Sequence, residues 1–330
     1  MEQHIKEKLK QIIDDLTLND LEKQIAIQNT LKKMRIELPF SEPININVAA
    51  EANFSIWNSS TQNSLHLDTG LNSLNNSLGG INKGELIVFG GRPGMGKTKL
   101  LVQIASYISK KNKVLYHSLE LNTFSITNFF ISCFSQVSLG SLASNQLSES
   151  EMQSVKESIE AMVEMKLLIS SNTINSNETV FDFYSKLIDE QGVEVICIDY
   201  LQLFSNQSMF KSREFEIALF LRKLKNFAKE KEITFLITSQ LNRAVEMRGG
   251  DRKPFLSDLR ESGSIEEYAD KVVFIYRPEY YQLMCDEYGN STIGIVELIV
   301  AKNNIGKLDT VLLHSDQNFT RFSEDFTWKK

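Results

Sequence analysis

The segment GRPGMGKT, from Gly91 to Thr98, constrains the fold of this chain more than any other feature. It fits the pattern G-x-x-x-x-G-K-T, follows the apolar run ELIVFGG (85–91) and opens KTKLLVQIASYISKK (97–111), which has a helical composition. A strand that leads through such a loop into a helix places backbone N–H groups around phosphate oxygens. The sequence therefore predicts a phosphate-binding P-loop made of Gly91, Arg92, Pro93, Gly94, Met95, Gly96, Lys97 and Thr98.

Two side chains of this loop are expected to contact ATP and its metal ion. Lys97 should reach the β- and γ-phosphates, and Thr98 should bind Mg²⁺ through its hydroxyl. A chance glycine-rich turn is the alternative, and the strand and helix on either side argue against it. The predicted cofactors are therefore ATP and Mg²⁺.

Apolar strands and helical stripes alternate from about residue 67 onward. VEVICID (193–199), ITFLITS (233–239), VVFIY (272–276) and IVELIVA (295–301) are typical of buried strands. Ser148 and Glu151 form an S-x-x-E capping box at the start of one intervening helix. This alternation predicts an α/β fold with a mostly parallel twisted sheet flanked by helices on both faces.

The first 66 residues have a different character. Residues 1–38 carry apolar residues at helical spacing and predict a short N-terminal helical segment. Residues 39–66 are rich in Ser, Asn and Pro and predict a surface linker to an ATPase domain at 67–330. The N-terminal helix could dock on a neighbouring subunit or pack on its own domain, and its pattern fits both equally.

Three polar residues end predicted strands, and in such sheets ligands bind beyond the carboxyl ends of the strands. Asp199 could hold Mg²⁺ through water, with a simple turn cap as the alternative. Glu120 could act as the general base that polarises the attacking water, although a lone strand-end Glu is more often merely solvated. Gln240 could sense the γ-phosphate, and taken alone it fits a structural role equally well.

The chain has a formal net charge of -6, which argues weakly against nucleic-acid binding. Two segments are nevertheless locally basic, and positive charges of this kind bind phosphates without sequence preference. Ordinary solvated loops are the alternative, favoured when the segments are considered alone. The basic residues of these segments are Lys211, Arg213, Arg243, Arg248, Arg252, Lys253 and Arg260.

The amino-acid composition indicates the cellular compartment and argues against a histidine metal site and a membrane span. The three cysteines, Cys133, Cys197 and Cys285, have no CxxC spacing, so we expect reduced thiols in a cytoplasmic protein. The four histidines are scattered, which argues against a histidine metal site. No apolar run is long enough to cross a bilayer, and no membrane partner is expected.

Several motifs together resemble the C-terminal RecA-like ATPase domain of DnaB-type replicative DNA helicases. They occur in the family's order and spacing across about residues 67 to 325, and SDLRESGSIE is the most specific of them. The motifs are GRPGMGKT (91–98), HSLE (117–120), IDYLQL (198–203), SQLNR (239–243), SDLRESGSIE (257–266), ADKVVFIYRPEYY (269–281) and VELIVAKN (296–303).

The resemblance implies roles for individual residues. Glu120 corresponds to the catalytic glutamate, Asp199 to the Walker B acid and Gln240 to the γ-phosphate sensor. Lys302 falls where the family reaches the γ-phosphate of the neighbouring subunit. The residues that correspond to the family's single-strand contacts in the central channel are Arg260, Glu261 and Gly263.

The sequence departs from the family in three places. Asn304 stands where the family usually has an arginine finger, and the helix after Glu120 carries Phe129 or Phe130 where an arginine is usual. No counterpart is expected for the N-terminal collar domain that meets primase. The resemblance implies an ATP-dependent helicase or translocase that forms a homo-hexamer on single-stranded DNA, with a helicase loader or primase as possible partners. The alternative is a relative that binds nucleotide and DNA or protein but hydrolyses little.

Overall fold

Strands and helices alternate through much of the described part of the chain, and six parallel strands end on one side of the sheet. The computed structural model describes residues 66–171, 177–203, 213–259, 262–316 and 318–324, together with Ile46 and Ala50. It divides the chain into residues 1–65 and residues 66–330, and the sheet lies in the second unit. The predicted helix at 1–38 lies outside the described residues, as does most of the predicted linker at 39–66.

One nine-stranded sheet runs through this unit in the order β3-β2-β4-β5-β1-β6-β7-β8-β9. The strands from β3 to β6 in this order are parallel, and β7, β8 and β9 extend the sheet in antiparallel pairs. The predicted mostly parallel sheet is therefore confirmed. The strands are β1 (Leu86–Gly91), β2 (Val114–Ser118), β3 (Leu167–Ser170), β4 (Val195–Asp199), β5 (Thr234–Gln240), β6 (Lys271–Tyr276), β7 (Ile295–Asn303), β8 (Thr310–Ser315) and β9 (Phe322–Ser323).

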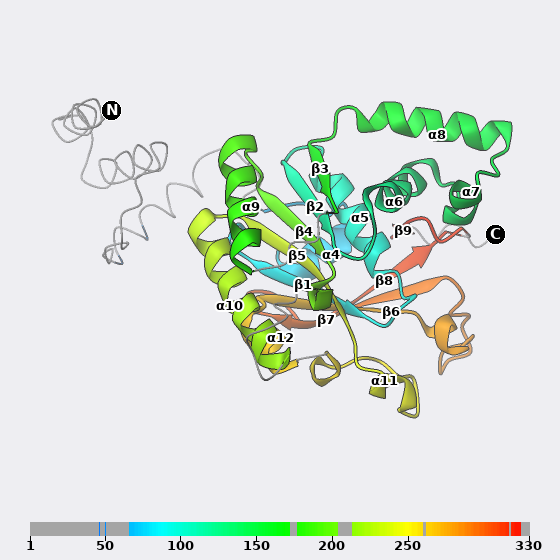
Figure 1. Cartoon of the computed structure of the whole chain (residues 1–330). Helices are drawn as coiled ribbons and strands as arrows, with labels where there is room; N and C mark the ends of the chain where they lie inside the picture. The colour runs from blue at the N-terminus through cyan, green and yellow to red at the C-terminus, as the bar shows by residue number, and fades with distance from the viewer. Residues whose placement is uncertain are drawn as a thin grey trace. The chain divides into compact units, whose positions relative to one another are not determined.

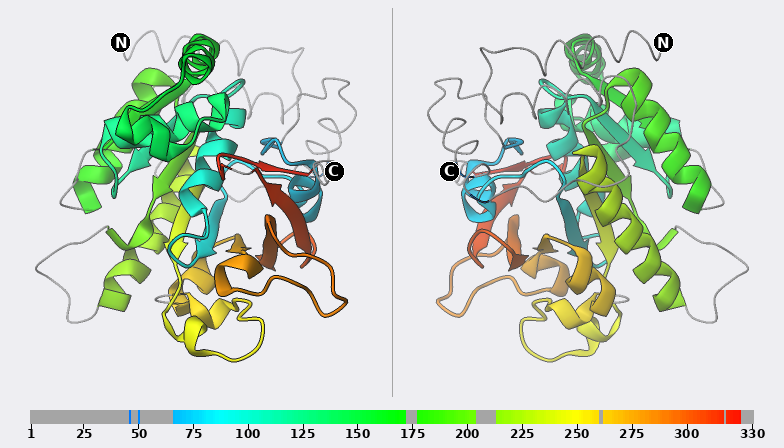
Figure 2. Two further views of the ribbon diagram at one scale, coloured as in Figure 1. Left: turned by 90° about the vertical axis from the view of Figure 1, so that its right-hand side faces the viewer. Right: turned by 90° about the vertical axis from the view of Figure 1, so that its left-hand side faces the viewer.

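Helices cover both faces of the sheet, as Figures 1 and 2 show. Side chains alternate along β1, so that Ile87 and Phe89 face one apolar cluster while Leu86 and Val88 face the other. The first cluster includes α4 (Asn72–Leu78), α5 (Lys97–Ile108) and α6 (Thr123–Ser135). The second includes α9 (Asn177–Gln191), α10 (Arg213–Lys231) and α12 (Ser262–Tyr268). The sheet is therefore the middle layer of three.

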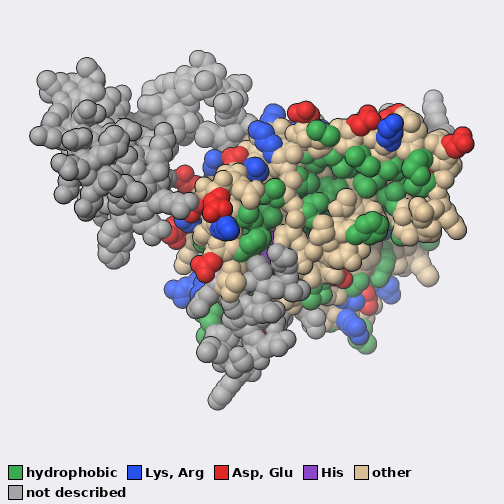
Figure 3. Space-filling model, turned by 45° about the horizontal axis from the view of Figure 1, so that its top comes forward, with side chains coloured by type: hydrophobic (Ala, Val, Ile, Leu, Met, Phe, Trp, Pro, Cys, Tyr) green, Lys and Arg blue, Asp and Glu red, His purple; other side chains and the backbone are tan. Residues whose placement is uncertain are grey.

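A smaller group of helices packs against α5 through α6. It comprises α6, α7 (Leu139–Ser144) and α8 (Glu149–Met162), and the predicted capping box of Ser148 and Glu151 is present at the start of α8. Figure 3 shows hydrophobic side chains gathered on the face that carries these helices. The most exposed of them are Phe124, Met152, Ile159 and Val163.

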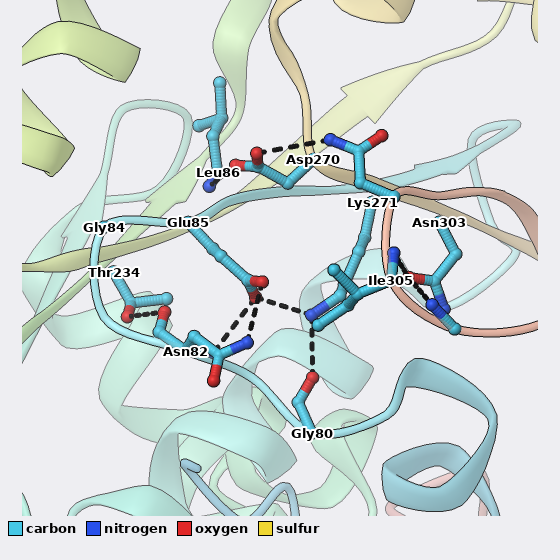
Figure 4. A network of polar contacts seen from close by, with 12 residues as sticks. Gly80, Asn82, Gly84, Glu85, Leu86, Thr234, Asp270, Lys271, Asn303 and Ile305 are labelled. Atoms are coloured by element: carbon cyan, nitrogen blue, oxygen red, sulfur yellow. Dashed lines mark hydrogen bonds and ion pairs between the residues drawn. The ribbon is translucent and has the colours of Figure 1, made fainter. Parts of the chain in front are cut away.

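The amino ends of the parallel strands are held together by buried charges (Figure 4). The fully buried Lys271 donates to Glu85 Oε2 at 2.6 Å and to the Gly80 carbonyl at 2.7 Å. Next to it, Asp270 accepts from the Leu86 N–H at 2.7 Å and from Lys225 Nζ at 2.5 Å. These contacts tie the start of β6 to the start of β1 and leave the carboxyl ends of both strands for the site.

Candidate nucleotide-binding site

The predicted P-loop joins the end of β1 to the first turn of α5. Gly94 has φ of 78° and Gly96 has φ of 100°, in the left-handed region where a side chain would be strained. A Cβ atom at Gly96 would also lie 2.8 Å from Cζ of Phe319, so glycine is required there on two counts. The loop thus curls tightly before α5, whose amino end has unpaired N–H groups and positive potential for an anion.

Lys97 is the first residue of α5, and its side chain turns back along the loop. Its Nζ donates to the Gly91 carbonyl at 2.8 Å and to the Arg92 carbonyl at 3.1 Å. Burial lowers the pKa of Lys97 to about 8, although the nearby charges of Asp199 and Glu120 act in the opposite direction. A phosphate in the loop would offer this ammonium a better partner than two neutral carbonyls.

Asp199 ends β4 and lies against the P-loop, as the sequence predicted. Its Oδ2 accepts from Thr98 Oγ1 at 2.7 Å and from the Tyr116 hydroxyl at 3.1 Å, and its Oδ1 accepts from Thr238 Oγ1 at 2.5 Å. A carboxylate and a hydroxyl at this separation are hard oxygen donors of the kind that Mg²⁺ prefers while it keeps several waters. The pair of Thr98 and Asp199 therefore fits a magnesium ion.

Glu120 and Gln240 also lie at this edge. Glu120 follows β2 and is exposed; partial burial and then the Asp199 carboxylate raise its pKa, while Lys97 lowers it. Glu120 and Lys97 each shift the pKa of the other, and the Asp199 charge shifts both. The three side chains therefore interact electrostatically. Gln240 ends β5, and its backbone N–H donates to Gln202 Oε1 at 3.2 Å. The structure thus assembles at one edge four of the five predicted catalytic residues, Glu120, Lys97, Asp199 and Gln240.

Lys302 lies at the opposite side of the sheet, where the parallel strands begin. It pairs with Val272 at the start of β6, and a β-bulge at this point shifts the register of β7. The bulge turns Lys302 toward α12, where its Nζ donates to the Glu266 and Ala269 carbonyls, both at 2.6 Å. Burial also lowers the pKa of Lys302. This lysine therefore lies away from the P-loop of its own chain.

The residues predicted to bind DNA have different surroundings. Lys211, Arg260 and Glu261 lie outside the described residues, and Arg213 begins α10. Gly263 is exposed in α12. Arg248 is paired within the chain: its Nη2 lies 2.5 Å from Asp258 Oδ1, and its guanidinium lies over the Phe255 ring.

Arg252 is likewise engaged within the chain. Its Nε donates to the Arg248 carbonyl at 3.2 Å, and its guanidinium lies 5.2 Å from the centre of the Tyr281 ring. Arg243 of the same segment is exposed. Contact of this segment with DNA therefore remains a prediction.

Comparisons with known proteins show the family of this chain. Residues 66–324 match the model of the DnaB-like helicase C terminal domain. The chain belongs to this family. Its sequence is 35% identical over 260 residues to the replicative DNA helicase DnaB of Buchnera aphidicola subsp. Baizongia pistaciae, covering 78% of this chain and 55% of that protein. It is 32% identical over 313 residues to the corresponding Rickettsia felis protein, covering 87% and 62%.

Solved structures support the same fold for this DnaB-like domain. One of them, described as an ATPase domain, has a TM-score of 0.76 and 26% identity, covering 86% of this chain and 99% of that one. A DnaB-like replicative helicase, described with its interactions with primase, has a TM-score of 0.75 and 25% identity, covering 98% and 75%. The fold is therefore RecA-like, as predicted. The chain spans only a little more than half the length of the curated relatives that it matches.

Several residues around the P-loop of this DnaB-like domain were not predicted from the sequence. Arg277 follows β6 and donates to the Gly94 carbonyl at 3.3 Å, and Lys99 donates to the Phe319 carbonyl. The Arg277 guanidinium lies 3.9 Å from the centre of the Phe319 ring. Because β6 is parallel to β1, Arg277 could have been found by the strand-end reasoning used for Asp199, which was not applied to β6. No local pattern pointed to Phe319.

No helix in the described ranges is both long and apolar enough to cross a bilayer.

Proposed function

We propose that this chain is an ATP-dependent DNA helicase or translocase of the DnaB type. ATP and Mg²⁺ bind at the P-loop, with Lys97 on the phosphates and Thr98 and Asp199 on the metal ion. Glu120 acts as general base toward the attacking water, and partial burial and the Asp199 carboxylate raise its pKa, which makes it a stronger base. Gln240 senses the γ-phosphate from the end of β5.

The position of Lys302 carries the proposal that the chain works as a ring. A lysine at the amino ends of the parallel strands serves a nucleotide only if that nucleotide belongs to a neighbouring subunit. Head-to-tail contacts of this kind close into rings, and we propose a homo-hexamer. The exposed apolar side chains on α6 and α8 offer a surface for such contacts between copies.

Single-stranded DNA is the proposed substrate along which the ring moves. Arg260, Glu261 and Gly263 would contact its backbone from the channel, with Lys211, Arg213, Arg248 and Arg252 adding positive charge. Arg248 must then act in part by holding Asp258, since the two are paired. One structural relative is described with primase, and we propose a primase or a helicase loader as a partner here as well.

Asn304 supports a second candidate function. An arginine finger contributes about 10³ to 10⁵ in rate, and a neutral amide at that position supplies no positive charge. The second candidate is a nucleotide-switched relative that binds ATP and DNA or protein and hydrolyses little.

Titration of ATP turnover with single-stranded DNA, beside native mass spectrometry, tests the two candidates. Turnover that rises with DNA in a six-subunit species supports the helicase or translocase. Tight nucleotide binding with negligible turnover on DNA supports the second candidate. Lys97→Ala should abolish nucleotide binding or turnover, and full activity in that variant would refute the site.

A further inference from the structure

The side chain of Arg92 leaves the P-loop and contacts the segment that follows β5. Its Nε lies 2.8 Å from Glu246 Oε1, and its Nη1 donates to the Leu241 carbonyl at 2.8 Å. The Arg92 side chain is 7% exposed and that of Glu246 is 38% exposed. A guanidinium so buried holds its partner more firmly than a surface ion pair does.

Glu246 belongs to a segment that is tied together internally. It lies in α11 (Ala244–Met247), and the Asn242 N–H of the same segment donates to the Asp258 carbonyl at 2.7 Å. Leu241 also bridges to Leu259. Together with the ion pair of Arg248 and Asp258, these contacts connect α11 to the residue just before position 260. Contacts within this segment therefore link Glu246 to Arg248, a proposed DNA-binding residue, and to Leu259.

The backbone of Arg92, in contrast to its side chain, contacts a residue of the nucleotide site. Its carbonyl accepts from Lys97 Nζ, and this bond is exchanged when Lys97 turns to a phosphate. The next residue but one, Gly94, has the positive φ that shapes the loop. Arg92 therefore lies between a group that must move on nucleotide binding and the segment that leads to position 260.

We propose that the contact between Arg92 and Glu246 couples the nucleotide state of the P-loop to the affinity of residues 241–259 for single-stranded DNA. In this role Glu246 is a positioning residue, because it acts through Arg92 and touches no substrate. The inference rests on the proposed function, since it takes DNA as the ligand of this segment. Coupling of this kind is reciprocal, so nucleotide alters DNA affinity by the same factor as DNA alters nucleotide affinity.

Glu246→Gln tests the inference, because it removes the charge and keeps the size of the side chain. The affinity for a fluorescent oligothymidylate is measured with no nucleotide and with a non-hydrolysable ATP analogue. In the natural chain we expect a ratio of about 5 to 150 between the two affinities. In Glu246→Gln the ratio should fall to within about twofold of one, with nucleotide affinity and basal turnover retained.

Three further variants separate coupling from a structural role. Glu160→Gln, on the exposed surface of α8, should keep the natural ratio. Arg92→Glu should lose the ratio, and the charge-swapped double variant Arg92→Glu/Glu246→Arg should regain part of it. A stabilising ion pair alone would shift the melting temperature and leave the ratio unchanged.

The outcomes distinguish the inference from the function on which it rests. A natural ratio in Glu246→Gln overturns the inference while the proposed function stands. Failure of the natural chain to bind the oligonucleotide, with and without nucleotide, overturns the proposed function and the inference with it.

Discussion

Lys97 and Lys302 lie at opposite ends of the parallel strands of one sheet. Lys97 follows the carboxyl end of β1, whereas Lys302 pairs with Val272 at the amino end of β6, which runs parallel to β1. β6 has six residues, so at about 3.3 Å per residue its two ends lie about 20 Å apart. A lysine side chain does not span this distance. If both lysines take part in ATP hydrolysis, each ATP site contains Lys97 of one subunit and Lys302 of a neighbouring subunit.

This separation predicts complementation between two inactive variants. Lys97→Ala subunits should not bind nucleotide, and Lys302→Ala subunits should bind it without turning it over. In a ring mixed from equal amounts, about a quarter of the interfaces join an intact Lys97 to an intact Lys302. Turnover should therefore return to about a quarter of the natural level when subunits are exchanged before the assay.

The control for complementation is a mixture in which subunit exchange is prevented. It should remain inactive, because each ring then contains one variant only. Full activity of Lys302→Ala alone would show that this lysine has no part in hydrolysis.

Asn304→Arg should raise ATP turnover in the assembled ring. Asn304 is exposed just beyond β7, and its backbone N–H donates to the Asp270 carbonyl at 3.2 Å, so a longer side chain can extend without displacing the core. An added guanidinium should give a rise of at least about tenfold, below the 10³ to 10⁵ of a fully adapted finger. Asn304→Gln is the neutral control, and steady-state phosphate release is the measurement. An unchanged rate in Asn304→Arg would mean that another cation already serves.

The P-loop and its acidic partner were predictable because the determinants are local. Glycines at 94 and 96 define a turn that other residues adopt only under strain, and Asp199 ends a run of buried apolar residues. Strand ends of a parallel sheet meet at one edge, which brought Gln240 and Glu120 into the same prediction. The alternation of strands and helices likewise predicted the layers of the fold.

Features that depend on pairing across the chain were not predictable. The bulge that turns Lys302 toward α12 depends on the register of β6 against β7, which no local pattern contains. The sequence placed Arg92 in the phosphate loop, but the partner of its side chain, Glu246, lies 154 positions away. Phe319 reaches the P-loop through the last strands of the sheet, again by long-range contact.

Nucleotide affinity should fall as the pH rises above about 8. The pKa of Lys97 is about 8 in the nucleotide-free chain, and bound phosphates add negative charge that raises it. Binding therefore favours protonated Lys97: affinity is full below this pKa and declines toward tenfold per pH unit above it. The phosphate groups lose their last proton near pH 6, so they contribute little in this range.

Fluorescent-nucleotide titrations between pH 7 and 9.5 measure this dependence. Lys99 is a matched control, because burial also lowers its pKa to about 8. Lys99→Gln should keep the decline, since its charge is not the one that the phosphates contact in the proposed site. A flat affinity across the range in the natural chain would contradict the assignment of Lys97.

Removal of the buried ammonium of Lys271 should destabilise the fold strongly. Its Nζ is held by Glu85 and by the Gly80 carbonyl, and the side chain is fully buried (Figure 4). Lys271→Ala leaves the Glu85 carboxylate without its counter-charge, which should lower the free energy of unfolding by about 3 to 5 kcal/mol. In Lys271→Met/Glu85→Gln no charge is left unpaired, so most of this loss should be recovered.

Urea denaturation followed by circular dichroism compares these variants. Lys229→Ala, on the exposed surface of α10, should change the free energy of unfolding by no more than about 0.5 kcal/mol. If Lys271→Ala and the double variant lose equal stability, the cost comes from the lost ammonium and its hydrogen bonds and not from the unpaired carboxylate. Equal stability of Lys271→Ala and the natural chain would mean that water or a proton compensates the Glu85 carboxylate once the lysine is gone.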